Sequence, residues 1–166
     1  SPSPATGPLA VPGRYTAALK TGDETYSMTF DVAPDPRLEG IVTQVDFENQ
    51  LTLALRARNA ASRANEMVIE IRKLKADLAD SCGAAGPKNC TQTITDLSEI
   101  EAALYQVKNE SPKDKIAYPI QLNDRLAGVL STFVSSDGPP TKGQETVLER
   151  LEADLNVLDE RFVHIK

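Results

Sequence analysis

Hydrophobic positions follow two different periods along the chain, one near its beginning and another through the rest. Apolar side chains alternate with polar ones through residues 14–19 and 25–32, a pattern that predicts strands with one apolar face. Thr21-Gly22-Asp23 lies between them and favours a tight turn, because glycine adopts positive φ. We therefore expect a β-hairpin over residues 13–33, with these side chains on its apolar face: Tyr15, Ala17, Leu19, Tyr26, Met28 and Phe30.

From residue 43 onward, apolar residues recur at spacings of three and four, which predicts amphipathic helices. Thr43 with Asp46, and Thr141 with Gln144, have the spacing of capping boxes, and Pro119 suits the first turn of a helix. Proline- and glycine-containing segments separate the periodic runs. We expect four helices, over residues 43–80, 91–109, 119–135 and 141 nearly to the end.

The last helix has the most regular pattern, a strict alternation of four and three. Such a seam fits helix packing in bundles and coiled coils. Packing inside the chain is favoured, because the other helices have matching stripes, and a homodimer through this seam is the alternative. The seam consists of Leu148, Leu151, Leu155, Leu158, Phe162 and Ile165.

Two features of the first two helices predict packing details. Ala57, Ala60 and Ala64 imply close approach of a neighbour to the first helix. Polar Asn59, Arg63 and Asn65 lie between its two apolar stripes, where we expect either a slight bend or a change of packing partner. Glu101 interrupts the apolar stripe of the second helix. We expect it to lie at the edge of the core and either to snorkel or to pair with an arginine, in preference to a catalytic role.

The predicted fold is mainly α: an antiparallel four-helix bundle with a long first helix, preceded by a β-hairpin. An isolated two-stranded hairpin is marginal in water. These strands therefore need the helices or strands from elsewhere, and we expect the chain to be part of a larger protein. Its predicted organisation is a linker at 1–12, the hairpin at 13–33, a junction at 34–42 and the bundle at 43–166.

Composition and charge exclude two classes of partner. The formal net charge is −6, the isoelectric point is near 4.9, and lysines and arginines do not cluster, so we expect no nucleic-acid partner. No apolar run approaches the roughly 18–20 residues that a membrane span needs. A membrane partner is therefore not expected.

Catalytic chemistry has few candidates in this sequence. His164 is the only histidine and lies next to the last residues, so neither a catalytic triad nor a two-histidine metal site can be assembled. The paired carboxylates, such as Glu145 and Glu149, have the spacing of a solvated helix face. We expect no catalytic residue, no metal and no cofactor.

The two cysteines, Cys82 and Cys90, lie close together around a segment that contains Gly83, Gly86 and Pro87. A disulfide between them would close the turn between the first two helices. Such a bond indicates an oxidising, extracytoplasmic location, either periplasmic or secreted. A pair of unbonded loop cysteines is the alternative.

Three residues near the start of the third helix form a candidate docking surface: Tyr118, Asn123 and Arg125. They combine an aromatic ring, an amide and a cation. The alternative is a local role, in which Tyr118 is an N-terminal staple and Asn123 and Arg125 tie neighbouring loops.

Several segments together resemble a known family of proteins. They are Gly7-Pro8, Pro12-Gly13-Arg14-Tyr15-Thr16, Asp35-Pro36-Arg37, Gln106-Val107-Lys108-Asn109, the stretch 118–123 with Leu126-Ala127, and Asp137-Gly138-Pro139-Pro140-Thr141. The first three are similar to the last strands of an immunoglobulin-like segment in large secreted bacterial β-propeller proteins with sortilin-type or neuraminidase-type repeats, often described as glycosyl-hydrolase-like. The others resemble the helical tail that ends those proteins.

This resemblance implies that the hairpin ends an immunoglobulin-like sandwich and that any chemistry on glycans belongs to the propeller. We therefore expect a non-catalytic C-terminal structural and interaction module. Its hairpin edge would contact upstream domains of the parent chain or another protein. The alternatives are an accessory domain of a glycoside hydrolase that contributes to its substrate site, and a helical adaptor that binds a protein.

Overall fold

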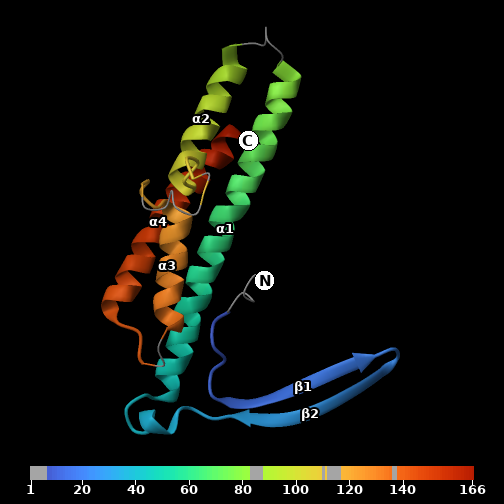
Figure 1. Ribbon diagram of the computed structural model, residues 1–166, viewed down its shortest axis with the longest axis vertical. Coiled ribbons are helices and arrows are strands. Elements are labelled where there is room, and N and C mark those ends of the chain that lie inside the picture. The colour runs from blue at the N-terminus through green and yellow to red at the C-terminus, as the bar shows by residue number, and fades with distance from the viewer. Residues whose placement is uncertain (1–6, 83–87, 110, 112–116, 136–137) are drawn as a thin grey trace.

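The computed structural model describes residues 7–82, 88–109, 111, 117–135 and 138–166, except for the side chains of Cys82, Lys88 and Asn89. Four helices form an elongated bundle, and a two-stranded hairpin projects from its base (Figure 1). The prediction of a mainly helical chain with a long first helix and a preceding hairpin is confirmed.

The hairpin consists of β1 (Gly13–Thr21) and β2 (Glu24–Val32), which pair antiparallel. Gly22 in the turn has a φ of 59°, which glycine adopts without a steric penalty. The register places Ala17 opposite Met28 and Leu19 opposite Tyr26. Because partners directly opposite share a face, the predicted apolar residues of both strands lie on one side of the ribbon.

Polar contacts hold the root of the hairpin to the bundle. The Tyr15 hydroxyl donates to the Val11 carbonyl at 2.6 Å, and the Gln44 amide donates to the Pro12 carbonyl at 3.2 Å. Beyond β2, a short 3₁₀ helix, η1 (Pro36–Leu38), leads into the first long helix. The Asp35 carboxylate accepts a hydrogen bond from the Arg37 amide there, so Arg37 is tied to its own turn.

Helix α1 (Gln44–Cys82) begins as predicted. The Asp46 carboxylate accepts from the Thr43 amide at 2.9 Å, and the Thr43 hydroxyl accepts from the Asp46 amide at 3.3 Å. These two bonds satisfy backbone donors that the first helical turn leaves unpaired. The capping box is therefore confirmed, with aspartate in the position where glutamate is usual.

Helices α2 (Lys88–Leu104) and α3 (Leu122–Val134) both run antiparallel to α1 and follow one another along it (Figure 1). Glu101 of α2 contacts Arg72, whereas α3 contacts the earlier half of α1. There the Asn123 amide lies 3.2 Å from the Asn65 carbonyl oxygen, and the Gln50 amide lies 2.6 Å from the Phe133 carbonyl. The predicted change of partner near Asn65 is confirmed.

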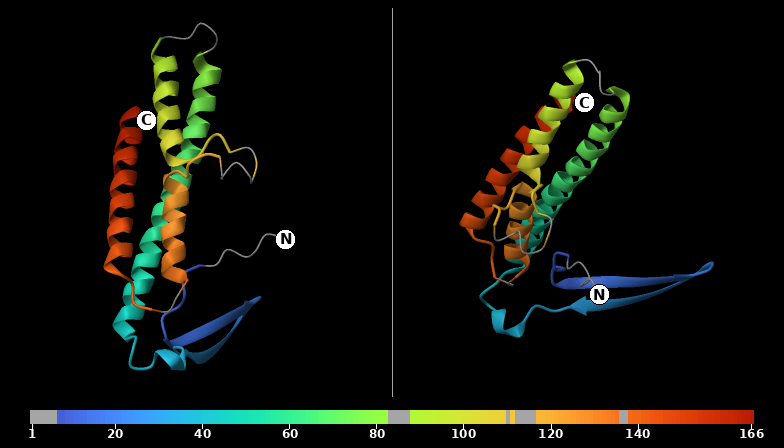
Figure 2. Two further views of the ribbon diagram at one scale, coloured as in Figure 1. Left: turned by 60° about the vertical axis from the view of Figure 1, so that its left-hand side comes forward. Right: turned by 45° about the horizontal axis from the view of Figure 1, so that its top comes forward.

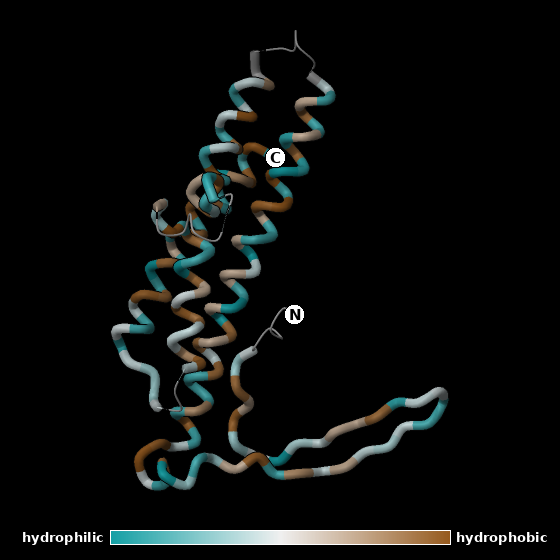
Figure 3. Tube along the Cα trace, viewed as in Figure 1, coloured by the Kyte–Doolittle hydropathy of each residue, from teal (hydrophilic) through white to brown (hydrophobic). Residues whose placement is uncertain are grey.

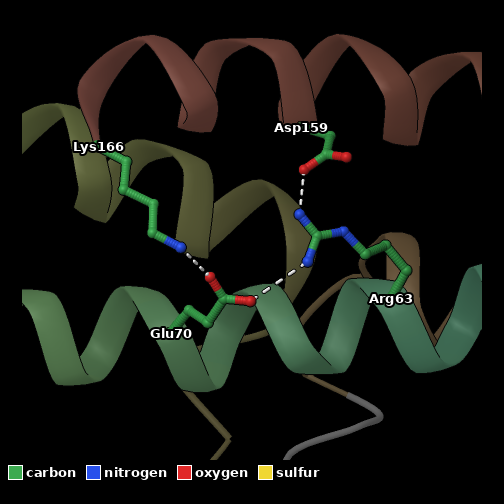
Figure 4. Close-up of polar contacts among 4 residues, drawn as sticks. All are labelled: Arg63, Glu70, Asp159 and Lys166. Carbon is green, nitrogen blue, oxygen red and sulfur yellow. Dashed lines mark hydrogen bonds and ion pairs between the residues drawn. The ribbon is translucent and has the colours of Figure 1, made fainter.

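Helix α4 (Lys142–Ile165) runs parallel to α1. Arg56 contacts Glu152, Arg63 contacts Asp159, and Lys166 contacts Glu70, so each step of seven residues on one helix matches a step of seven on the other. Figure 4 shows Glu70 held between Arg63 and Lys166. As far as Glu70, a cross-section of the bundle thus contains α1, α4 and either α2 or α3, and beyond it α1 and α2 continue without α4 (Figure 2).

The core contains small alanine side chains of α1, together with large buried side chains such as Met67 and Ile71 of the same helix and leucines of the other helices. Ala57 and Ala64 are fully buried, as the predicted close approach requires. The seam of α4 is buried inside the chain, which confirms the favoured interpretation of that pattern. Its buried members are Leu148, Leu151, Leu155, Leu158 and Phe162.

Two predicted helix ends are wrong. Helix α2 ends at Leu104, and Val107 beyond it is 48% exposed, although we expected a helix to residue 109. Helix α3 begins at Leu122, so Pro119 is not in its first turn and Ile120 is exposed. The Gln106 amide donates to the Pro119 carbonyl at 2.8 Å. This bond across the connection holds both flanking segments outside the helices.

Candidate protein-binding surface

One face of the hairpin forms an exposed apolar surface outside the core. We call it the arm face and define it as Tyr15, Ala17, Leu19, Tyr26, Met28 and Phe30. Leu19 is 66% exposed and Met28 is 68% exposed. Figure 3 shows apolar segments of the arm well away from the helices. A grouped apolar surface of this kind marks an interaction site.

Local chemistry explains why this sequence forms an amphipathic ribbon. Tyr15 and Phe30 stack on the arm face with ring centroids 6.1 Å apart. On the opposite face, Arg14 forms an ion pair with Asp31 at 3.0 Å. Cross-strand aromatic and charged pairs of this kind each stabilise a two-stranded sheet by a fraction of a kcal/mol, about 0.2–1.

The backbone edges of the arm form a second part of this surface. The sheet contains β1 and β2 alone among the described residues, so each strand has an outer edge with no neighbouring strand in that part of the chain. Neither strand contains proline, which would blunt an edge. The outer edges therefore offer backbone donors and acceptors to an added strand.

An apolar cavity of about 240 Å³ lies where the arm joins the bundle. The segment before β1, the end of β2, and α1 and α3 line it, with Leu9, Val32, Phe47 and Phe133 among its walls. The Gln50 amide at this cavity donates to the Phe133 carbonyl at 2.6 Å. The cavity is thus a packing gap at the root of the arm, whose polar side chain already has a structural contact.

The three predicted docking residues have different contacts. Tyr118 lies before α3, with the Lys108 ammonium 5.6 Å from its ring centroid. Asn123 faces α1, where its amide donates to Asn65, while Arg125 lines a shallow groove beside Asp154 and α4. The contact of Asn123 fits a local role, although it ties two helices and not two loops. Docking through Tyr118 and Arg125 stays a prediction.

Glu101 is a buried carboxylate with two cationic partners. Its side chain accepts from Arg72 at 2.6 Å and from Lys75 at 3.0 Å. Burial acts to raise the pKa of Glu101, but these two hydrogen bonds outweigh it and hold the pKa below the ordinary glutamate value. An ionised, paired carboxylate cannot donate a proton near neutral pH. The predicted pairing with an arginine is confirmed.

The cysteines lie at the end of the bundle opposite the arm. Cys82 ends α1, and Cys90 lies in the first turn of α2 and is half-buried. The side chain of Cys82 lies outside the described residues. The disulfide between the two stays a prediction.

The described part of the chain contains neither a metal-site cluster nor a helix able to span a membrane. Within residues 7–82, 88–109, 111, 117–135 and 138–166, no cluster of histidine, cysteine and carboxylate side chains has the arrangement of a metal site. None of the helices described there has both the length and the apolar character that crossing a bilayer requires. His164 is exposed near the end of α4.

Sequence reasoning identified the arm face but missed the ion pairs between α1 and α4. Their signal was present as charged residues at heptad spacing in both helices, at Arg56, Arg63, Glu70, Glu152, Asp159 and Lys166.

Comparison with protein-family models, curated proteins and solved structures finds no match to this chain.

Proposed function

We propose that this chain is a non-catalytic structural and interaction module that binds a protein partner through its hairpin arm. The single observation that carries the proposal is the arm itself, which has one exposed apolar face and two outer edges and projects from the bundle (Figures 1 and 2). A two-stranded ribbon is marginal alone, so a partner that covers it supplies the missing stabilisation.

The proposed context is a larger extracytoplasmic β-propeller protein. The resemblance of the hairpin and helical segments to the C-terminal region of such proteins supports this, as does the pair Cys82 and Cys90 if it is oxidised. The partner surface is a β-sheet, which belongs to upstream domains of the parent chain or to another protein. A sheet edge fits because strand addition satisfies the outer backbone groups and continues the apolar arm face across the partner sheet.

The bundle supports a structural role better than an independent binding role. The apolar seam of α4 packs inside the chain, with Leu148 fully buried and Phe162 nearly so. A partner could reach this seam only after the bundle opened. The arm is therefore a more accessible surface than the seam.

Two adjacent residues of β1 provide a matched test. Leu19 lies on the arm face and Ala18 on the opposite face, and both are exposed. A photo-reactive amino acid is placed at each position in turn, in the source cell. We expect covalent capture of one defined protein from position 19 and not from position 18.

The captured protein is then purified and titrated with the chain. Leu19→Lys should weaken binding at least about tenfold, because it places a charge where apolar area would be buried, whereas Ala18→Lys should leave it unchanged. Equal capture from both positions, or unchanged affinity of Leu19→Lys, would contradict the proposal. Turnover of glycans or peptides by the purified chain would contradict its non-catalytic character.

A further inference from the structure

The outer edge of β2 fits a second copy of this chain. We propose that β2 strands from two copies pair antiparallel about a two-fold axis between their Met28 residues, giving a four-stranded sheet in the order β1-β2-β2-β1. This inference deepens the proposed function and rests on it, because it assumes that the arm is an interaction element. It assigns one edge of the arm to self-association and leaves the arm face for the other partner.

The sequence of β2 is symmetric in character about Met28. Pairing about this residue places Tyr26 opposite Phe30 of the second copy and Ser27 opposite Thr29 of the second copy. Over residues 25–31, apolar residues then meet apolar ones and polar residues meet polar ones. Because side chains alternate between faces, this register joins the two arm faces into one continuous apolar surface.

Charge selects β2 over β1 for this contact. In the β2 pairing, Asp31 lies opposite Thr25 and Glu24 opposite Val32 of the second copy, so no like charges face each other directly. The equivalent pairing of β1 about Ala17 would place Arg14 opposite Lys20 of the second copy. Like charges directly across a ladder are destabilising. The β1 edge is therefore the poorer site for self-pairing.

Pairing of β1 with β2 between copies is a different case, because it uses two unlike edges. Such a contact is heterologous and repeats without closing unless its rotation closes a ring. The β2 contact uses the same edge on both copies and therefore closes as a dimer. The dimer contains one shared sheet of four strands. A sheet with an apolar face needs at least three strands for independent stability.

The shape of the molecule leaves room for this dimer. Each arm projects from its bundle at Gly13 and Val32, and the two β2 strands run in opposite directions. The nine residues of β2 span about 30 Å, so the two bundles lie at opposite ends of the shared sheet, about this distance apart. Figure 2 shows the arm extending beyond the helices in both views.

Cysteine substitution at the proposed axis tests the contact directly. Residues opposite each other across an antiparallel ladder have Cα atoms about 4.5–5.5 Å apart, within the range that a disulfide spans. Met28→Cys in the full chain should therefore give a covalent dimer on mild oxidation, with the linked peptides identified by mass spectrometry. Ala17→Cys is the matched control, because Ala17 pairs with Met28 on the same face. In the proposed dimer its two copies lie about three strand spacings, or 14 Å, apart.

Charge substitution gives a reversible measurement. Analytical ultracentrifugation of the unmodified chain at rising concentration should show a monomer–dimer equilibrium. Met28→Lys should weaken the dimer at least about tenfold, because it sets two cations against each other at the axis and removes buried apolar area. Ala17→Lys places the same charge on the arm face away from the axis and should leave the equilibrium unchanged. Circular dichroism checks that both variants retain their helices.

Three results would overturn the self-pairing. They are a chain that stays monomeric at every concentration, cross-linking of Ala17→Cys as efficient as that of Met28→Cys, and open-ended polymers in place of dimers. If self-pairing fails while position 19 still captures another protein, the proposed function survives without the dimer. If the dimer forms and position 19 captures nothing, the arm serves self-association and the proposed binding of another protein fails.

Discussion

Arg56 on α1 and Glu152 on α4, 96 positions apart, form an ion pair with two hydrogen bonds, from Nη2 at 2.6 Å and from Nε at 3.2 Å. The same offset recurs at Arg63 with Asp159 and at Glu70 with Lys166. Three contacts at one offset define the parallel register of α1 and α4. We infer that these ion pairs act on alignment more than on total stability, because partly exposed pairs contribute little energy.

Neutralising one member of this series should have a small, salt-dependent effect. Glu152→Gln should lower the free energy of unfolding by about 0.5–1 kcal/mol at low salt, and the loss should shrink in about 1 M salt, where the Debye length falls to about 3 Å. Denaturant titration at both salt concentrations measures this. The exposed Glu160 on the same helix offers a control, and Glu160→Gln should change stability by less. A loss for Glu152→Gln that is unchanged by salt would contradict an electrostatic role.

We expect neutralisation of Glu101 to lower the free energy of unfolding more than neutralisation of any other carboxylate. Its side chain is only 8% exposed and accepts from Arg72 and Lys75. Glu101→Gln keeps the size but removes the charge, so we expect a loss of about 1–3 kcal/mol, typical of hydrogen bonds to a charged group. Thermal and denaturant unfolding measure it. Glu99, largely exposed and paired with Arg161 at 3.3 Å, is the control, and Glu99→Gln should cost less than about 1 kcal/mol.

The hydrogen bonds of Glu101 with Arg72 and Lys75 predict a pH dependence of stability with a defined sign. The pKa of Glu101 in the folded chain lies below the ordinary value of 4.5. Its contribution to stability is therefore fully present above about pH 4.5 and is lost as the pH falls through the folded pKa. Unfolding curves of the unmodified chain and of Glu101→Gln should converge as the pH falls from 4.5. A stability difference that stays constant below this pH would show that the charge of Glu101 is not the cause.

The buried alanines of α1, which are Ala57, Ala60 and Ala64, should tolerate no larger side chain. Ala64 is fully buried where α1 changes its partner from α3 to α2. Ala64→Leu should destabilise the bundle by about 1–3 kcal/mol, because overpacking forces neighbouring side chains from their preferred rotamers. Ala76 on the same helix is exposed, and Ala76→Leu should change stability by less than about 0.5 kcal/mol. Equal effects of the two substitutions would argue against close packing at Ala64.

Local patterns predicted those features that neighbours in sequence determine. Thr141 and Gln144 form the expected capping box, with the Gln144 side chain accepting from the Thr141 amide at 2.8 Å. The predicted ends of α2 and α3 were wrong because the bond between Gln106 and Pro119 joins two non-helical segments that are 13 residues apart in the sequence. Helical periodicity identifies a buried face but not the helix that covers it.

The arrangement of α2 and α3 in series along α1 was accordingly absent from the prediction. The lengths of the helices carried a hint, since α2 and α3 together match most of α1. The arm illustrates the same limit, because a local pattern identifies an apolar face but not whether another element covers it. Alternation correctly predicted the face of Leu19 and Met28, yet no local signal indicated that the helices would leave it uncovered.

The cysteine pair gives a prediction about the tip of the bundle. Helix α4 ends beside Glu70, so α1 and α2 beyond this point depend on each other for packing. A bond between Cys82 and Cys90 would link them at their far end. For a closed loop of this size, chain entropy gives a stabilisation of about 2–3 kcal/mol.

Thiol alkylation of the unfolded, unreduced chain should label neither Cys82 nor Cys90, and reduction beforehand should expose both. Reductant should then lower the unfolding temperature of the unmodified chain. The double variant Cys82→Ser and Cys90→Ser should unfold near the temperature of the reduced chain and should not respond to reductant. Two reactive thiols before reduction would show that the pair is unbonded, and would remove the support that it lends to an oxidising compartment.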